Sequence, residues 1–135
     1  MRSLDTNVLA RFLVDDVDDA QAATQRPAAI EALSQRAFVS VTVLLELEWV
    51  LRGFYVLPRR DIVRALRALA GIEHLVVEDR DAVLTALEAV DRGLDFADAL
   101  HVARSARATA FATFDKRLAK RAKTLALSPL VELLG

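Results

Sequence analysis

The chain has 135 residues, of which 54% are hydrophobic and 27% are charged, and its formal net charge is −1. This size and composition suit one globular domain, residues 1–135, and leave little room for a second. Cysteine is absent, which excludes a disulfide framework and a cysteine-type zinc site, so an intracellular, cytoplasmic setting is the simplest expectation.

The N-terminal segment argues against export and membrane insertion. Asp5 and Asn7 interrupt the stretch that would have to form the apolar core of a signal peptide. No uncharged stretch reaches the ~20 residues needed to cross a bilayer. We therefore expect a soluble protein without a membrane partner.

The first half of the chain is predicted to alternate strands with helices. The expected strands cover residues 1–4 and 37–41, and the expected helices cover residues 8–14, 18–35 and 43–51. Asp18 or Asp19 could cap the second helix, which Pro27 either kinks or divides. Thr42 is the expected cap of the third helix. Because that helix is apolar nearly all round, we expect it to be largely buried.

The second half continues the alternation. The expected helices cover residues 59–71, 79–93, 95–106 and 116–122, and the expected strands cover residues 74–78, 109–115 and the segment after 124. Asp95 and Asp98 are spaced like a capping box with Asp in place of Glu. Alternating strands and helices favour an α/β fold in three layers, α/β/α, with a central parallel sheet. Ligands in such folds bind outside the carboxyl ends of the strands.

Four acidic residues fall where this fold would place a ligand site: Asp5, Glu46, Asp98 and Asp115. Carboxylates that converge within a few ångströms repel one another and raise one another's pKa values unless a cation compensates them. Hard oxygen ligands without cysteine or a histidine pair favour Mg²⁺ or Mn²⁺ over zinc. The sequence therefore suggests a divalent-cation site.

Each acid also has a structural interpretation. Asp5 could cap the first helix, Asp98 could be a capping-box acid, and Asp115 could cap the basic helix that follows it. Glu46 differs because it interrupts an apolar helix, where an unpaired buried carboxylate is costly. A functional role is therefore the favoured interpretation for Glu46.

Several other polar and aromatic side chains have expected roles beside the acids. Those that could orient the carboxylates are Asn7, Thr113, Thr6 and Ser40. His101 follows Asp98 by one turn, but its apolar neighbours favour a packed helix histidine, and His74 is a weaker candidate still. Trp49, Phe54 and Tyr55 are expected in the core or in an interface. The basic segments 58–67 and 116–123 are solvated helix faces or phosphate contacts.

The motifs "LDTNVL", "VTVLLELEWVL", "DFADALH" and "ATFDKRL", in this order, resemble those of PIN-domain ribonucleases. The resemblance is closest to the VapC-type toxins of type II toxin–antitoxin pairs and covers essentially the whole chain. It places the family's acids on Asp5, Glu46, Asp98 and Asp115, and the family's amide on Asn7. The hydroxyl ahead of the second acid would be Ser40 or Thr42.

The resemblance implies an endoribonuclease that depends on Mg²⁺ or Mn²⁺, forms a homodimer and pairs with a small antitoxin that binds DNA. Metal held by Asp5, Glu46 and Asp98, with Asp115 as a further candidate, would activate water for attack on a phosphodiester. Basic residues after the last acid would hold the phosphates of the RNA. These residues are Lys116, Arg117, Lys120 and Arg121.

Two other classes of protein are alternatives to a PIN-domain ribonuclease. A phosphate-handling domain of the response-receiver kind needs an acidic pair after the first strand, where this chain has Thr6 and Asn7. A PIN-like binding module with little turnover, as in FitB-like proteins, would act through its complex with a DNA-binding partner. The intact set of acids argues against the second interpretation without excluding it.

Overall fold

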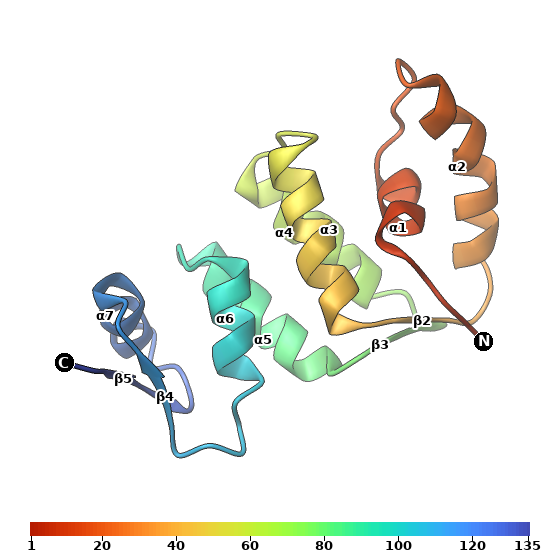
Figure 1. Cartoon of the computed structure of the whole chain (residues 1–135). Helices are drawn as coiled ribbons and strands as arrows, with labels where there is room; N and C mark the ends of the chain where they lie inside the picture. Colours follow the sequence, from red (N-terminus) through yellow and green to blue (C-terminus); the bar gives the residue numbers. More distant parts are fainter. The chain divides into compact units, whose positions relative to one another are not determined.

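The computed structural model describes residues 1–135 and divides into two compact units. Residues Met1–Glu78 form the first, here called the N-terminal unit, and residues Asp79–Gly135 form the second, the C-terminal unit. Each has its own parallel strands and its own covering helices (Figure 1).

The sheet of the N-terminal unit has three parallel strands in the order β1-β2-β3. The strands are β1 (Arg2–Ser3), β2 (Ala37–Val39) and β3 (Leu75–Val77). Ala37 in the central strand pairs with Arg2 on one side and Leu75 on the other. The strands are short, and β2 and β3 each bury their first and third side chains, as strands covered by helices do.

Four helices belong to this unit: α1 (Thr6–Leu13), α2 (Ala20–Leu33), α3 (Val41–Gly53) and α4 (Arg59–Ala70). They pack in the order α2, α1, α3, α4 (Figure 1). Asp19 caps α2 by accepting hydrogen bonds from the backbone of Gln21 and Ala22, and Pro27 lies inside this single helix. Of the two interpretations of Pro27, division into two helices is therefore wrong.

Helix α3 begins two residues earlier than the sequence predicted. Ser40 has extended backbone angles and its hydroxyl accepts a hydrogen bond from the backbone nitrogen of Val43 at 3.3 Å. Ser40 is thus the cap, and the expectation that Thr42 caps this helix is wrong. Thr42 lies inside the first turn, where its hydroxyl is 3.1 Å from that of Ser40.

The expectation that α3 is largely buried is also wrong. One stripe of the helix, Leu44, Leu47 and Leu51, is buried at helical spacing. Trp49 is 61% exposed, and Glu46 is exposed as well. A helix covered on one face hides only that stripe, however apolar its other positions are.

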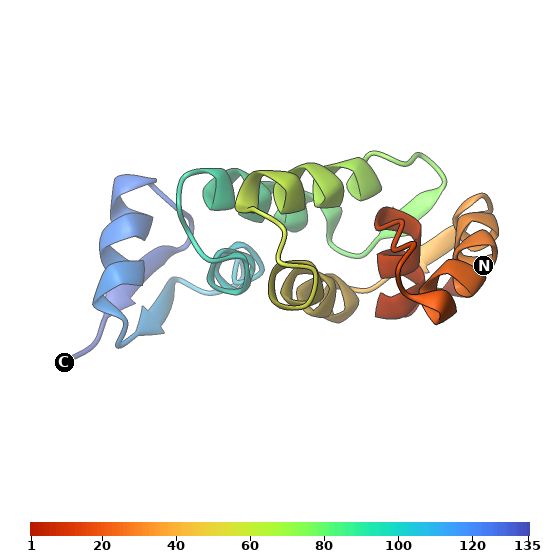
Figure 2. The ribbon, with the colours of Figure 1, turned by 90° about the horizontal axis from the view of Figure 1, so that it is seen from above.

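The C-terminal unit pairs two helices and adds a strand–helix–strand segment. Its elements are α5 (Arg80–Asp91), α6 (Phe96–Ala103), β4 (Ala110–Thr113), α7 (Lys116–Thr124) and β5 (Leu130–Leu133). Strands β4 and β5 are parallel, and α7 connects them and packs on both (Figure 2). Helices α5 and α6 pack against each other through their buried apolar residues.

The expected capping box at the start of α6 is not formed. Asp95 has the backbone conformation of a helix cap, but its carboxylate accepts no hydrogen bond from the helix. Repulsion between the Asp95 and Asp98 carboxylates is consistent with this, because Asp95 raises the pKa of Asp98.

Among all seven helices of the chain, none combines the length and the apolar character that a membrane span needs.

Candidate active site

The two acids of the N-terminal unit are linked through Thr6. Asp5 follows β1 and caps α1, with its Oδ1 atom accepting a hydrogen bond from the backbone nitrogen of Thr6 at 2.8 Å. The Thr6 side chain is buried, and its hydroxyl donates a hydrogen bond to Oε1 of Glu46 on α3. The hydroxyl contact expected of Thr6 is therefore present, and it restrains the Glu46 carboxylate.

The buried acid of α3 is Glu48, not Glu46. Glu48 is 8% exposed, and its two carboxylate oxygens accept hydrogen bonds from Nε of Arg52 at 2.9 Å and from Nη2 at 3.2 Å. The argument that a buried unpaired carboxylate marks Glu46 for function is thus wrong. What distinguishes Glu46 is its contact with Thr6 beside Asp5.

Asn7 and Ser40 were expected to orient the acids, and the structure gives them other surroundings. Asn7 lies on the exposed start of α1, where it lines a groove of about 350 Å³ together with Arg2, Arg11 and alanines of α2. Ser40 caps α3 and contacts Thr42.

One further acid lies at a strand end, and it was not among the predicted site residues. Glu78 directly follows β3, and its Oε1 accepts a hydrogen bond from the backbone nitrogen of Val41 at 2.8 Å. The position after a strand, which singled out Asp5, could have found it too. Because its carboxylate binds the first turn of α3, Glu78 orders the helix that carries Glu46.

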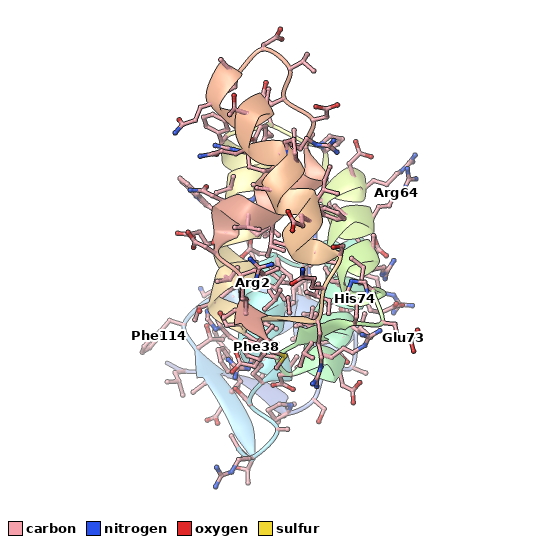
Figure 3. All side chains as sticks on the ribbon, turned by 90° about the vertical axis from the view of Figure 1, so that its right-hand side faces the viewer. Arg2, Phe38, Arg64, Glu73, His74 and Phe114 are labelled. Carbon is pink, nitrogen blue, oxygen red and sulfur yellow. The ribbon has the colours of Figure 1, made fainter.

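His74 has a structural role at the other end of β3. His74 lies directly before β3 (Figure 3), and its imidazole Nε2 contacts the backbone oxygen of Leu33 at the end of α2. This contact joins the end of α2 to the start of β3, which gives His74 a structural role.

In the C-terminal unit, the Asp98 carboxylate feels the negative charges of Asp95 and Asp115. Burial raises the pKa of the Asp98 carboxyl above its ordinary value of 3.8, the negative charges of Asp95 and Asp115 raise it further, and His101 lowers it. The charged form of Asp98 is therefore disfavoured by its surroundings. Asp95 is a member of this set that the sequence analysis treated as a cap alone.

Asp115 is held by the start of α7. Its Oδ1 accepts hydrogen bonds from the backbone nitrogens of Arg117 at 2.9 Å and Leu118 at 3.1 Å. Its own backbone nitrogen donates to the hydroxyl of Thr113 at 3.0 Å. Thr113 thus orders the backbone of Asp115, as an orienting residue would, but does not contact a carboxylate.

The chemistry of these side chains suits a hard cation, although no complete site is formed within either unit. Carboxylate and hydroxyl oxygens are the ligands that Mg²⁺ prefers, and the negative charge crowded at Asp98 is what a cation would relieve. Within neither unit do three or more acidic or histidine side chains stand close enough to hold a metal ion. Asp5 and Glu46 belong to the N-terminal unit and Asp98 and Asp115 to the C-terminal unit, so a site formed by all four acids stays a prediction.

The predicted RNA-binding residues lie on the surface of α7. Lys116, Arg117, Lys120 and Arg121 are all exposed. Three of them line one pocket of this unit, together with Arg92, whereas Lys116 does not. Arg92 was missed because it lies outside both basic segments of the sequence.

Parallel strands followed by acid-bearing helices define a class of α/β domains whose ligand sites lie at strand ends. The family profile of the PIN domain matches residues 3–124, and the chain belongs to this family. The expected fold class is thereby confirmed. PIN domains have a nuclease-type fold and are typically metal-dependent nucleases. Comparison with curated proteins and with solved structures gave no match.

Proposed function

We propose that the protein is an endoribonuclease that uses Mg²⁺ or Mn²⁺ and acts as the toxin of a toxin–antitoxin pair. The observation that carries the proposal is the half-buried carboxylate of Asp98, which burial and the negative charges of Asp95 and Asp115 destabilise in its charged form, in a chain of the PIN family. Folding does not benefit from uncompensated carboxylates held together. A cation that neutralises them gives this arrangement a use.

The proposed metal ligands are Asp5, Glu46, Asp98 and Asp115. When bound, Mg²⁺ supplies positive charge that stabilises the leaving oxygen of a phosphodiester and makes water a better nucleophile. The chain restrains the ligands: one oxygen of Asp5 and one of Asp115 accept backbone hydrogen bonds, which leaves the second oxygen of each carboxylate for an ion. Thr6 does the same for Glu46.

One observation favours the alternative, a PIN-fold binding module with little turnover. Neither unit gathers three potential metal ligands, so the acids could serve folding alone. In this alternative the protein would act through a DNA-binding partner. Such a protein would keep its affinity for that partner when Asp98 is changed and would cut RNA no faster with Mg²⁺ than without.

A cleavage assay separates the two functions. The purified chain should cut single-stranded RNA with Mg²⁺ or Mn²⁺ and stop when EDTA removes the metal. Asp98→Asn should abolish cleavage, whereas Asp81→Asn, which neutralises an exposed acid at the start of α5, should leave it unchanged. Equal rates with and without metal, or an active Asp98→Asn protein, would contradict the proposed nuclease.

We also propose that the chain forms a homodimer and binds a small antitoxin. Apolar side chains exposed near the end of α3 support this, namely Trp49 at 61%, Phe54 at 67% and Val56 at 76%. Burying such side chains in an interface is favourable because it removes apolar area from water. Light scattering at micromolar concentration should show a dimer, and Trp49→Lys should weaken it. A wild-type monomer would contradict the dimer.

A further inference from the structure

The C-terminal unit contains a pocket whose lining is mostly cationic. Its volume is about 390 Å³, and it is lined by Arg92, Arg117, Lys120, Arg121, Thr124 and Leu125. This volume lies within the range of roughly 300–1,000 Å³ found for ligand sites. Four of the six residues carry a positive charge and none carries a negative one.

Two segments that are distant in the sequence build this pocket. On α7, Arg117, Lys120, Arg121 and Thr124 follow the i, i+3, i+4, i+7 spacing that puts them on one face. The opposite wall is Arg92, in the turn between α5 and α6. Nη1 of Arg121 donates a hydrogen bond to the backbone oxygen of Arg92 at 3.4 Å and so connects the two walls.

Gly93 makes room for this contact. It has a φ of +101°, and a Cβ atom added there would lie 2.5 Å from Nη1 of Arg121. A side chain at position 93 would therefore push the guanidinium away from the turn, and the positive φ would strain the backbone of any other residue. The glycine permits the Arg121 side chain to lie across the turn.

The charges in the pocket are not compensated by their own unit. None of the four cations forms an ion pair with a carboxylate of this unit, whereas Arg104 pairs with Asp79. Like charges held around one cavity repel one another. Their field attracts an anion, and arginine guanidinium groups match phosphate oxygens in geometry.

We infer that this pocket binds phosphate groups of an RNA strand. The inference deepens the proposed function, on which it rests, by adding Arg92 to the RNA-binding surface and leaving Lys116 out. Leu125 is the apolar part of the wall and no aromatic side chain lines the pocket, so contact there is with the backbone of the strand and is independent of its sequence. Asp115, a proposed metal ligand, directly precedes the helix that forms one wall.

Helix α7 offers a matched control for this inference. Lys120 lines the pocket and Lys123 does not, although both are exposed lysines on the same helix. If RNA is attracted only by the overall charge of α7, replacing either lysine has the same effect. If the pocket is a defined phosphate site, only Lys120 and Arg92 matter.

The experiment measures the affinity of a fluorescently labelled single-stranded RNA by anisotropy, over a series of KCl concentrations and in EDTA to prevent cleavage. The proteins are wild type, Lys120→Ser, Arg92→Gln, the double variant and Lys123→Ser. Each lost phosphate contact should lower the slope of log affinity against log salt by about 0.7. We expect this decrease for Lys120→Ser and for Arg92→Gln, about twice as much for the double variant, and no change for Lys123→Ser.

The outcomes distinguish this inference from the proposed nuclease. Equal slopes for Lys120→Ser and Lys123→Ser, or an unchanged slope for Arg92→Gln, would overturn the phosphate site, even if the wild type cleaves RNA with Mg²⁺. A wild type that binds RNA with the expected slopes but never cleaves it would support the site and contradict the nuclease. Circular dichroism checks that each exposed substitution leaves the fold intact.

Discussion

The two units hold their acids in different ways. In the N-terminal unit, the Asp5 carboxylate accepts a backbone hydrogen bond and Glu46 accepts one from the Thr6 hydroxyl. In the C-terminal unit, burial raises the pKa of the Asp98 carboxyl, and the like charges of Asp95 and Asp115 raise it further. The first set is restrained by hydrogen bonds, and the second has a charge imbalance that its own unit does not correct.

This difference predicts what each set would offer a bound cation. Hydrogen-bonded carboxylates are held in fixed orientations, which limits the entropy lost when an ion is bound. Crowded carboxylates supply the electrostatic gain, because a cation removes their repulsion. We therefore expect hydrogen-bond restraint to matter most at Asp5 and Glu46, and relief of repulsion to matter most at Asp98. Four predictions test this contrast.

The largest effect is expected when Glu46 on α3 is replaced by an uncharged amide, with the same replacement of Glu48 as the control. Glu46→Gln should lower the rate of RNA cleavage roughly 1,000-fold, the equivalent of about 4 kcal/mol, because a ligand of the ion is lost while Oε1 still accepts from Thr6. Glu48→Gln should leave cleavage unchanged and reduce the free energy of unfolding by about 1 kcal/mol, because its hydrogen bonds to Arg52 are weakened. Rates come from a cleavage assay and stabilities from urea unfolding. An active Glu46→Gln protein would remove Glu46 from the site.

The next largest effect is expected on stability, from replacing one glycine in each unit by alanine. Gly93→Ala should destabilise the chain by about 1–2 kcal/mol, because alanine is strained at positive φ and its Cβ meets Arg121. Gly53→Ala, at the end of α3 with no atom closer than 3.8 Å to the added Cβ, should stabilise it by up to about 1 kcal/mol. Thermal unfolding measures both. A Gly93→Ala protein at least as stable as wild type would show that the Gly93 turn is not constrained.

Removing a helix cap should have a somewhat smaller effect. Asp115→Ala should cost about 1 kcal/mol of unfolding free energy, because two backbone donors of α7 lose their acceptor. Asp115→Asn should cost only a few tenths, since asparagine caps nearly as well. If Asp115 binds the ion, both variants lose cleavage activity although only one loses stability. Equal activity in Asp115→Asn and wild type would limit Asp115 to capping.

The smallest effect tests the crowding at Asp98. A raised pKa in the folded state means that the charged carboxylate destabilises the fold at neutral pH, and that this cost is absent below the unfolded value near 3.8, where both states are protonated. Asp98→Asn should therefore raise the thermal midpoint at pH 7, and the difference should vanish as the pH falls below 3.8. Mg²⁺ should stabilise wild type more than this variant. A lower midpoint for Asp98→Asn at pH 7 would contradict the crowding.

Hydrophobic spacing was enough to predict the elements of the fold. Seven helices and five strands occur in the predicted order, and Gly71 and Asp19 stand at the helix ends where they were expected. Burial was harder to predict, because an apolar position such as Trp49 is buried only if another element covers it. The start of α3 was misplaced because Ser40 and Thr42 are both good caps, and only the backbone angles distinguish them.

For the candidate site, motif order was enough to predict the identities of the acids but not their environments. Motif order singled out Asp98, and the structure adds the neighbours that raise its pKa. Nothing in the sequence showed that Glu78 binds the start of α3, or that Arg92 faces Arg121, because both contacts join segments that are distant along the chain. Such pairs depend on packing and not on local spacing.

Because Asp5 and Asp115 cap helices, replacing either of them would lower the stability of the fold as well as any activity. If the protein is the proposed nuclease, a descendant that has lost the activity would still be under selection to keep an acid or an amide at these two positions, because losing the cap weakens a helix. Glu46 and Asp98 cap no helix, and replacing Asp98 is expected to stabilise the fold, so drift would change them first once catalysis was no longer needed. Among related sequences, the second and third acids should therefore separate active enzymes from inactive ones better than the first and fourth.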